Sequence, residues 1–295
     1  MEKYKGALAV LIGAASFGIL STFVKKAYQA GFNLAEVTGI QAFFGAVLLW
    51  LLWLIFYPKN DETKYPSKSP KWKIIIAGIS TGTVSILYYK SVSLVPASLA
   101  IVLLMQYIWI GQLIEMVFFK VKPSLSQLIV IICILAGTVI ATGLLEEPWH
   151  SFSFEGIIYG LLAATAYALF IIVNGRVGND YPPLKKSALM ITGAFILISI
   201  VLQPISLIQA DVVIGILPFG LLLALFGTVI PPLLFSYGMP KTGYSLGSVL
   251  GAIELPVAII MSSFYLNESV SLFKWSGVAF ILLTIIWKNN LKTNS

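Results

Sequence analysis

Three ionisable residues lie inside long apolar runs, and they are the residues of this chain best placed to do chemistry. They are Glu254, Glu115 and Lys90. A charged side chain at the centre of a lipid bilayer costs at least about 2.5–3.5 kcal/mol, so such a residue is expected either to have a function or to reach the bilayer surface. The position of each residue within its run separates these two possibilities.

Glu254 lies near the middle of the apolar run 245–265, and no lysine lies within one helical turn of it. A carboxyl group at this depth could carry a proton or balance the charge of a cationic solute. The alternative is a protonated carboxyl group that bonds the helix backbone, because Pro256 frees a carbonyl one turn earlier. The sequence alone leaves both interpretations open.

Glu115 and Lys90 lie closer to the ends of their runs. Glu115 is one turn from the end of the run 98–119, near Lys120 and Lys122, and Lys90 is in the last turn of the run 72–94. Long side chains in such places usually extend to the bilayer surface, which we expect for both. If Lys90 instead faces a cavity, it would bind an anionic group such as an amino-acid carboxylate.

Neutral polar and aromatic residues in the same runs are further candidates for a solute pocket. Gln106 and Trp109 are three residues apart and therefore share one face of a helix. The other candidates are Gln41, Tyr88, Tyr107, Tyr167, Asn174 and Tyr237. Aromatic residues in membrane helices are more often core residues or interfacial anchors than ligands, so each remains a candidate only.

The elements that carry these residues follow from composition. Of the 295 residues, 58% are hydrophobic and 11% are charged, and the mean hydropathy is +0.93. Soluble domains carry about 25% charged residues, so much of this apolar surface must face lipid. The fold class is therefore all-α integral membrane. A membrane-spanning helix needs about 20 apolar residues, and we expect spans at 6–24, 35–56, 72–94, 98–119, 125–145, 154–177, 187–207, 212–239, 245–265 and 271–287.

Basic residues give the orientation of these spans. With the N-terminus inside, only Lys25, Lys26, Lys90 and Lys274 of the 19 basic residues fall outside. Cytoplasmic loops of membrane proteins carry the excess of lysine and arginine. We therefore expect a multi-pass protein of the cytoplasmic membrane with both termini in the cytoplasm. Basic residues confined to short loops also argue against nucleic acid as a partner; we expect a small solute and membrane lipid.

Several other function classes find no support in the sequence. The chain has one cysteine, Cys133, and one histidine, His150, so neither a disulfide framework nor a His-rich metal centre is expected. No Gly-x-x-x-x-Gly-Lys-Ser/Thr loop occurs, which argues against transport driven by the chain's own ATP hydrolysis. No cofactor is indicated.

The chain also repeats itself weakly. Residues 95–99 correspond to 242–246 at an offset of 147, and Gly6, Ala14 and Phe17 correspond to Gly156, Ala164 and Tyr167 at an offset of 150. Five helices in each half would place the halves in opposite orientations, as in secondary transporters whose solute site lies between the repeats. We expect repeats at 1–146 and 153–288 and a cytoplasmic tail at 289–295. One chain would supply both halves, so it could act as a monomer.

Three stretches resemble the drug/metabolite transporter superfamily, and specifically its ten-helix members with two EamA domains. They are the small-residue opening at 6–18, the turn at 89–100, and Glu254 with Pro256 before the Leu266–Asn267–Glu268 segment. The chain departs from the family pattern at Gln41, where an arginine is common, and at Trp109, which takes the place that Pro256 has in the second half. The resemblance implies transport of amino acids or related metabolites, with the first four helices of each half lining the pathway.

We therefore expect a secondary transporter, and more specifically an exporter of amino acids or other small organic metabolites, that works by alternating access. Transport could be facilitated, by exchange, or coupled to protons through Glu254. One alternative is an integral-membrane enzyme acting on lipid or a lipid-linked substrate, which would need clustered catalytic side chains at one interface. Another is a channel, which would need a pore-lining ring or selectivity loop. The sequence shows neither pattern.

Overall fold

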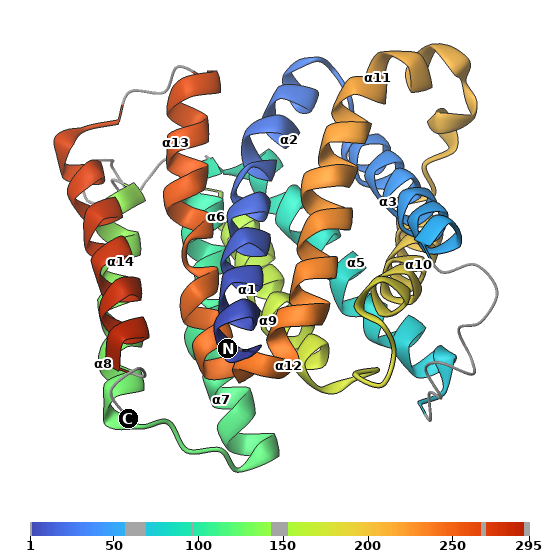
Figure 1. Cartoon of the computed structure of the whole chain (residues 1–295). Helices are drawn as coiled ribbons and strands as arrows, with labels where there is room; N and C mark the ends of the chain where they lie inside the picture. The colour runs from blue at the N-terminus through green and yellow to red at the C-terminus, as the bar shows by residue number, and fades with distance from the viewer. Residues whose placement is uncertain (1, 57–68, 96, 143–152, 267–269, 292–295) are drawn as a thin grey trace.

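The computed structural model of the chain is a bundle of helices (Figure 1) and describes residues 2–56, 69–95, 97–142, 153–266 and 270–291. The predicted turn residue Pro96, His150 and the Asn267–Glu268 segment lie outside the described residues. All regular structure within these ranges is helical. The α-helices are α1 (Glu2–Gly18), α2 (Leu20–Gln29), α3 (Leu34–Phe56), α5 (Lys71–Leu94), α6 (Ala97–Met105), α7 (Tyr107–Phe119), α8 (Leu125–Thr142), α9 (Phe154–Arg176), α10 (Pro183–Leu202), α11 (Ala210–Leu223), α12 (Ile230–Gly251), α13 (Glu254–Leu266) and α14 (Leu272–Leu291). A 3₁₀ helix, η2 (Ile205–Ile208), and a π-helical segment, η3 (Ala224–Val229), lie on either side of α11.

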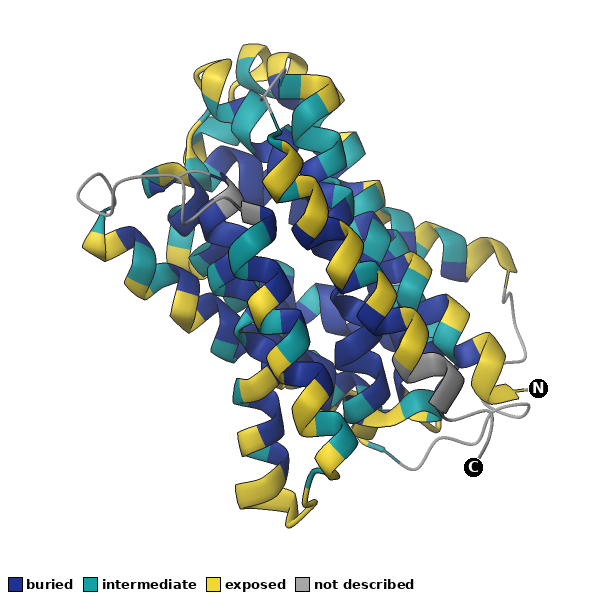
Figure 2. Cartoon of the chain, turned by 90° about the vertical axis from the view of Figure 1, so that its left-hand side faces the viewer, coloured by how far each residue is buried: buried dark blue, intermediate teal, exposed yellow. Residues whose placement is uncertain are grey.

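Six helical stretches in the described part of the chain are long and apolar enough to cross a membrane. They are Glu2–Gln29, Leu34–Phe56, Leu99–Phe119, Phe154–Arg176, Pro183–Leu202 and Ala210–Leu266. Exposed residues line the outside of the bundle (Figure 2), and large apolar residues are among them; Leu54, Phe118 and Phe264, for example, are 64%, 75% and 77% exposed. Such surface is unfavourable in water and costs nothing against lipid tails. The predicted class, an all-helical membrane protein, is confirmed.

The helices pack in a few close pairs. α1 lies along α12, α5 packs against both α9 and α10, and α3 packs against α10. α8 and α14 pack against each other at one edge of the bundle (Figure 1). The buried centre of the molecule is therefore surrounded by α1, α3, α5, α9, α10 and α12, with α8 and α14 to one side.

Three of the expected continuous spans are interrupted. The backbone N–H groups of Ile19, Gln106 and Ala252 bond carbonyls three residues earlier, at 3.3, 3.2 and 3.2 Å, where an α-helix would bond the fourth. The breaks separate α1 from α2, α6 from α7, and α12 from α13. Short 3₁₀ pieces inside helices often mark functional hinges.

The third break changes the position of Glu254. We expected this residue in the middle of a continuous helix, but it lies in the first turn of α13. Pro256 explains the difference, because proline is tolerated in the first turn of a helix, where its missing N–H would have no partner anyway. A carboxyl group in this turn is also near the positive end of the helix dipole.

The glycines of this region do not share one role. The spacing of Gly243, Gly247 and Gly251 predicts a single small face for helix packing, and this prediction is wrong for Gly243. Its backbone has φ 72° and ψ 169°, which interrupts the helix within α12, and no atom of a described residue lies within 4 Å of where its Cβ would be. Gly247 and Gly251 do allow close packing, against Met239 and Tyr107.

The expected start of the seventh span is also corrected. α10 begins at Pro183 and includes Lys185 and Lys186, although the prediction began at Ser187 to exclude both lysines. Lys186 is 1% exposed, and its ammonium group donates to the Asn174 carbonyl at 2.7 Å and to Asn179 Oδ1 at 2.9 Å. These acceptors allow the burial, because a buried charge is tolerated when its hydrogen bonds are made.

Candidate functional site

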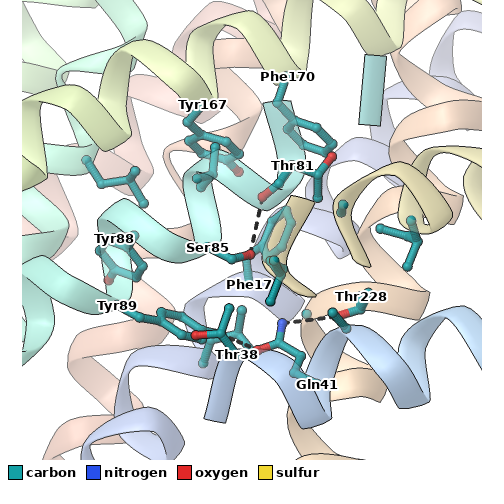
Figure 3. A pocket seen from close by; sticks show the side chains of 18 of the residues that line it. Phe17, Thr38, Gln41, Thr81, Ser85, Tyr88, Tyr89, Tyr167, Phe170 and Thr228 are labelled. Carbon is teal, nitrogen blue, oxygen red and sulfur yellow. Dashed lines mark hydrogen bonds between the residues drawn. The ribbon is translucent and has the colours of Figure 1, made fainter. Parts of the chain in front are cut away.

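A small cavity lies in the core where the interrupted helices meet the π-helical segment (Figure 3). Its volume is about 50 Å³. Since one water molecule needs roughly 10–15 Å³ of such space, the cavity has room for a few waters and none for an organic solute. Its polar lining residues are Thr38, Gln41, Thr81, Ser85, Tyr88, Tyr89, Tyr167, Thr228 and Glu254.

The irregular backbone brings these side chains together. Phe17 and Leu20 flank the break between α1 and α2, Thr228 lies in η3, and Glu254 follows the break before α13. Gly18 permits this approach, because a Cβ atom at that position would lie 2.5 Å from the Glu254 carbonyl oxygen. Backbone irregularity at membrane depth is tolerated where it is buried in protein or lines a cavity.

Glu254 supplies the carboxyl group of the cavity. It is 3% exposed, and Tyr167 Oη donates a hydrogen bond of 3.1 Å to its Oε2 atom. No cation forms an ion pair with Glu254 among the described residues. The hydrogen bond from Tyr167 is the contact that the structure shows for this carboxyl group.

Aromatic rings form the wall around this carboxyl group. Tyr167 stacks on Phe170 with ring centroids 5.8 Å apart, and Phe17 meets the edge of Tyr167 at 5.8 Å. Tyr107 packs behind Tyr167 at 4.7 Å. Such contacts fix ring positions through preferred edge and stacked geometries, so the wall holds the Tyr167 hydroxyl in place.

An amide side chain, here called the amide clamp, lies on the opposite side of the cavity. Gln41 on α3 accepts a hydrogen bond from Tyr89 Oη at 2.6 Å and donates one to Thr228 Oγ1 at 3.0 Å (Figure 3). Ser16 Oγ donates to the Phe226 carbonyl at 2.7 Å and so satisfies part of the π-helical backbone. Side chains from α1 and α3 thereby hold η3 at the cavity, and Tyr89 of α5 holds the Gln41 amide.

Two hydroxyl groups of the lining remain unused. Among the residues that the structure describes, Thr81 Oγ1 and Tyr88 Oη are buried and have no hydrogen-bond partner, although Tyr88 lies near Ser21. Buried polar groups are nearly always satisfied by protein, water or ligand. Both residues line the cavity, so water in it could satisfy these two hydroxyl groups.

Comparison with known proteins adds to this geometry. The model of the EamA-like transporter family matches the sequence twice, over residues 4–143 and 154–289. The chain belongs to the EamA-like transporter family. The resemblance drawn from residues 6–18, 89–100 and Glu254 with Pro256 is thereby confirmed. The family and its named members support a multi-pass membrane transporter and not an enzyme.

Individual relatives of this EamA-like chain are distant but extensive. The uncharacterized transporter YcbK of Bacillus subtilis is 23% identical over 99% of this chain and 96% of its own length. The threonine/homoserine exporter RhtA of Salmonella typhimurium is 24% identical over 81% of this chain and 77% of its own length. A solved crystal structure with 14% identity superposes with a TM-score of 0.71 over 96% of both chains, which shows a shared fold.

The structure of this EamA-like protein brings four of the ten predicted site residues to the cavity: Glu254, Gln41, Tyr88 and Tyr167. Tyr107 lies one layer behind, and its hydroxyl group donates to the Ser248 carbonyl at 2.9 Å.

The other five predicted residues lie elsewhere. Trp109 donates to Gln106 at 2.8 Å, as their shared face predicts, but the pair does not line the cavity and Trp109 is 38% exposed. Tyr237 lies under the Lys241 ammonium, 3.4 Å from its ring centroid, and Asn174 bonds Ser236 at 3.1 Å. Lys90 lines a wide cleft at the end of the bundle where α2 ends.

Glu115 also differs from its prediction. It is 5% exposed and does not reach the surface; both of its carboxylate oxygens accept hydrogen bonds from Arg176 Nη2, at 2.7 and 2.8 Å. The two residues are 61 positions apart, on α7 and α9. The pairing satisfies the carboxylate and explains why it need not extend to the bilayer surface.

Sequence reasoning missed Thr38, Thr81, Ser85, Tyr89 and Thr228. A signal was present for some of them. Thr81, Ser85 and Tyr88 are four and three residues apart and so share one face of α5, as Thr38 and Gln41 share one face of α3. A polar stripe at helical spacing inside an apolar run would have identified both faces.

Proposed function

We propose that this protein is a secondary transporter that exports amino acids or similar small metabolites across the cytoplasmic membrane by alternating access. The observation that carries the proposal is the small cavity at Glu254, which is lined by hydroxyl, amide and carboxyl groups and bounded by broken helices. Broken helices around a midplane site are the usual construction of secondary transporters. The threonine/homoserine exporters among the relatives support amino acids as the substrate class.

Two wider cavities support an alternating mechanism. A cavity of about 330 Å³ opens beside Glu115 and Arg176, and a cleft of about 700 Å³ opens at the other end beside Lys25 and Lys90. The central cavity between them has only about 50 Å³. This arrangement resembles a closed state, in which rocking of the two halves would open the centre to one side or the other.

Ten spans in two inverted five-helix repeats account for the packing. The five spans of the first half would be α1–α2, α3, α5, α6–α7 and α8. The five spans of the second half would be α9, α10, α11 to the first part of α12 (including η3), the last part of α12 to α13, and α14. Contacts then occur in related pairs. The contact of the first span with the eighth (α1 with α12) corresponds to the contact of the sixth span with the third (α9 with α5). The second and seventh spans (α3 and α10) pack against each other, and so do the fifth and tenth (α8 and α14).

The helix breaks support the same division. The break at Gln106 in the fourth span and the break at Ala252 and Ile253 in the ninth are separated by 146 to 147 residues, which agrees with the 147-residue offset of the sequence repeat. We accordingly retain repeats at 1–146 and 153–288, with a tail at 289–295, and both termini in the cytoplasm. The end of the bundle that holds Glu2 and Lys241 would then face the cytoplasm.

The test is transport by the purified chain in proteoliposomes loaded with labelled L-threonine. Efflux that saturates and is accelerated by unlabelled L-threonine on the opposite side would support alternating access. In exchange, the carrier returns to the first side with a solute bound and does not have to reorient empty. Efflux without saturation or acceleration would indicate a channel. The proposal would be overturned if threonine, homoserine and other amino acids left the proteoliposomes no faster than they leave protein-free liposomes loaded in the same way.

A further inference from the structure

The cavity beside Glu115 and Arg176 has the properties of a second binding site. Its volume is about 330 Å³, near the lower end of the range for small-molecule pockets. Gln112, Tyr244 and Ser245 contribute further polar groups to its lining. It lies at the C-terminal end of α9, where Gly175 and Arg176 line it. It shares no lining residue with the central cavity.

The guanidinium group of Arg176 is held firmly but is only partly used. Only Nη2 donates to Glu115; the other N–H groups of Arg176 form no hydrogen bond with any described residue. The Phe119 ring lies 3.7 Å from the guanidinium carbon and fixes one face of the group. A planar guanidinium with free N–H groups is well suited to bind a carboxylate.

Gln112 offers a second unused group. Its side chain is 7% exposed and lines the cavity, and its amide forms no hydrogen bond within the described part of the chain. The amide oxygen could accept from an ammonium group, as could the remaining lone pairs of the Glu115 carboxylate. Carboxylate and ammonium partners thus lie side by side in one cavity.

The charge balance selects among solutes. Arg176 and Glu115 are the charged residues of the lining, and together they are neutral. A bound anion or cation would add one uncompensated charge beside this pair, in which the Glu115 side chain is 7% exposed and the Arg176 side chain 42% exposed. A zwitterion adds one charge of each sign and keeps the cavity neutral.

We infer that this cavity binds the carboxylate and ammonium groups of a zwitterionic α-amino acid, with Arg176 holding the carboxylate and Gln112 and Glu115 the ammonium group. The inference rests on the proposed transport function and names its substrate class. The site would be the place where the solute waits before the central cavity opens. Tyr107 and Tyr244 lie between the two cavities; each donates to a backbone carbonyl across the contact of α7 with α12, at 2.9 and 2.6 Å.

The inference can be tested by binding to the full-length purified chain carrying Glu254→Gln, so that the central carboxyl group does not contribute. Calorimetry would compare L-threonine with 3-hydroxybutyrate, which lacks the ammonium group, and with threoninol, which lacks the carboxylate. We expect L-threonine to bind and both analogues to bind at least roughly ten-fold more weakly, as expected for the loss of one charged hydrogen bond. Equal binding of either analogue would overturn the inference.

Variants locate the site. Arg176→Gln should weaken L-threonine binding roughly ten- to hundred-fold. Because this change leaves Glu115 unpaired and can harm folding, Gly175→Leu provides an independent test: it keeps both charges and fills the cavity, and the nearest atom to a Cβ there is 3.8 Å away. Lys241→Gln is the matched control, since it removes a cation at the same end outside the cavity lining.

The outcomes separate this site from the transport proposal. Binding that is lost in Gly175→Leu and kept in Lys241→Gln supports the site, even if proteoliposomes show no transport, in which case the transport proposal alone fails. Binding unchanged in Gly175→Leu overturns the site. Absence of binding of L-threonine, homoserine, serine and glycine to a folded Glu254→Gln chain also overturns it, whatever the transport assay shows.

Discussion

The hydroxyl group of Tyr167 on α9 donates a hydrogen bond of 3.1 Å to the carboxyl group of Glu254 on α13. A hydroxyl can donate to an ionised carboxylate or to the carbonyl oxygen of a protonated carboxyl group. The contact can therefore persist whether or not Glu254 carries a proton. This property suits a residue that would exchange protons or cationic groups during a transport cycle.

Glu254→Gln should abolish the pH dependence of transport while leaving the amount of folded protein unchanged. Glutamine keeps the size of the side chain and can still accept from Tyr167, but it cannot release a proton. The measurement is efflux from proteoliposomes as a function of pH on each side. Tyr167→Phe is the control: it removes the hydrogen bond but keeps the carboxyl group, so pH dependence should remain. Unchanged pH dependence in Glu254→Gln would remove proton coupling through this residue.

Gln41→Leu should destabilise the protein. It would leave the buried hydroxyl groups of Tyr89 and Thr228 without their present partners, at about 1–3 kcal/mol for each unsatisfied group. The melting temperature in detergent should therefore fall. The triple variant with Tyr89→Phe and Thr228→Val removes the orphaned hydroxyls and should recover part of the loss. A Gln41→Leu protein as stable as the parent would contradict the clamp.

The membrane class and four of the nine polar lining residues could be predicted from the sequence. Composition decides the class, because the apolar surface of such a chain exceeds what its own core can bury. Glu254, Gln41 and Tyr167 were found because polar groups inside apolar runs are costly and therefore informative. These inferences depend on single residues and their immediate neighbours along the chain.

What could not be predicted depends on contacts between distant segments. Gln106 breaks a helix without proline or glycine beside it, and the π-helical turn at 224–229 is stabilised by Ser16, 210 residues from Phe226. Arg176 and Glu115 meet only through the packing of α7 against α9. No local pattern encodes these partners, so Glu115 was expected at the bilayer surface instead of in an ion pair.

Gly111→Ala should weaken the crossing of α7 and α12. A Cβ atom at Gly111 would overlap the ring and hydroxyl of Tyr244, just as one at Gly251 would overlap the Tyr107 hydroxyl. Overpacking of this kind typically costs about 1–3 kcal/mol. The melting temperature of Gly111→Ala should fall, and adding Tyr244→Ala should restore part of it by removing the collision. Additive losses in the double variant would contradict this contact.

The proposed orientation can be tested with single cysteines, because Cys133 is the one native cysteine and Cys133→Ser removes it. Ala30→Cys lies after α2 and Lys122→Cys lies between α7 and α8, and both positions are exposed. Since basic residues concentrate on the cytoplasmic side, a membrane-impermeant maleimide should label position 30 in intact cells and position 122 only after permeabilisation. The control is equal labelling of both positions in detergent. The reverse pattern would invert the topology, and it would place the Arg176 cavity on the outer face, where the solute would leave an exporter instead of entering it.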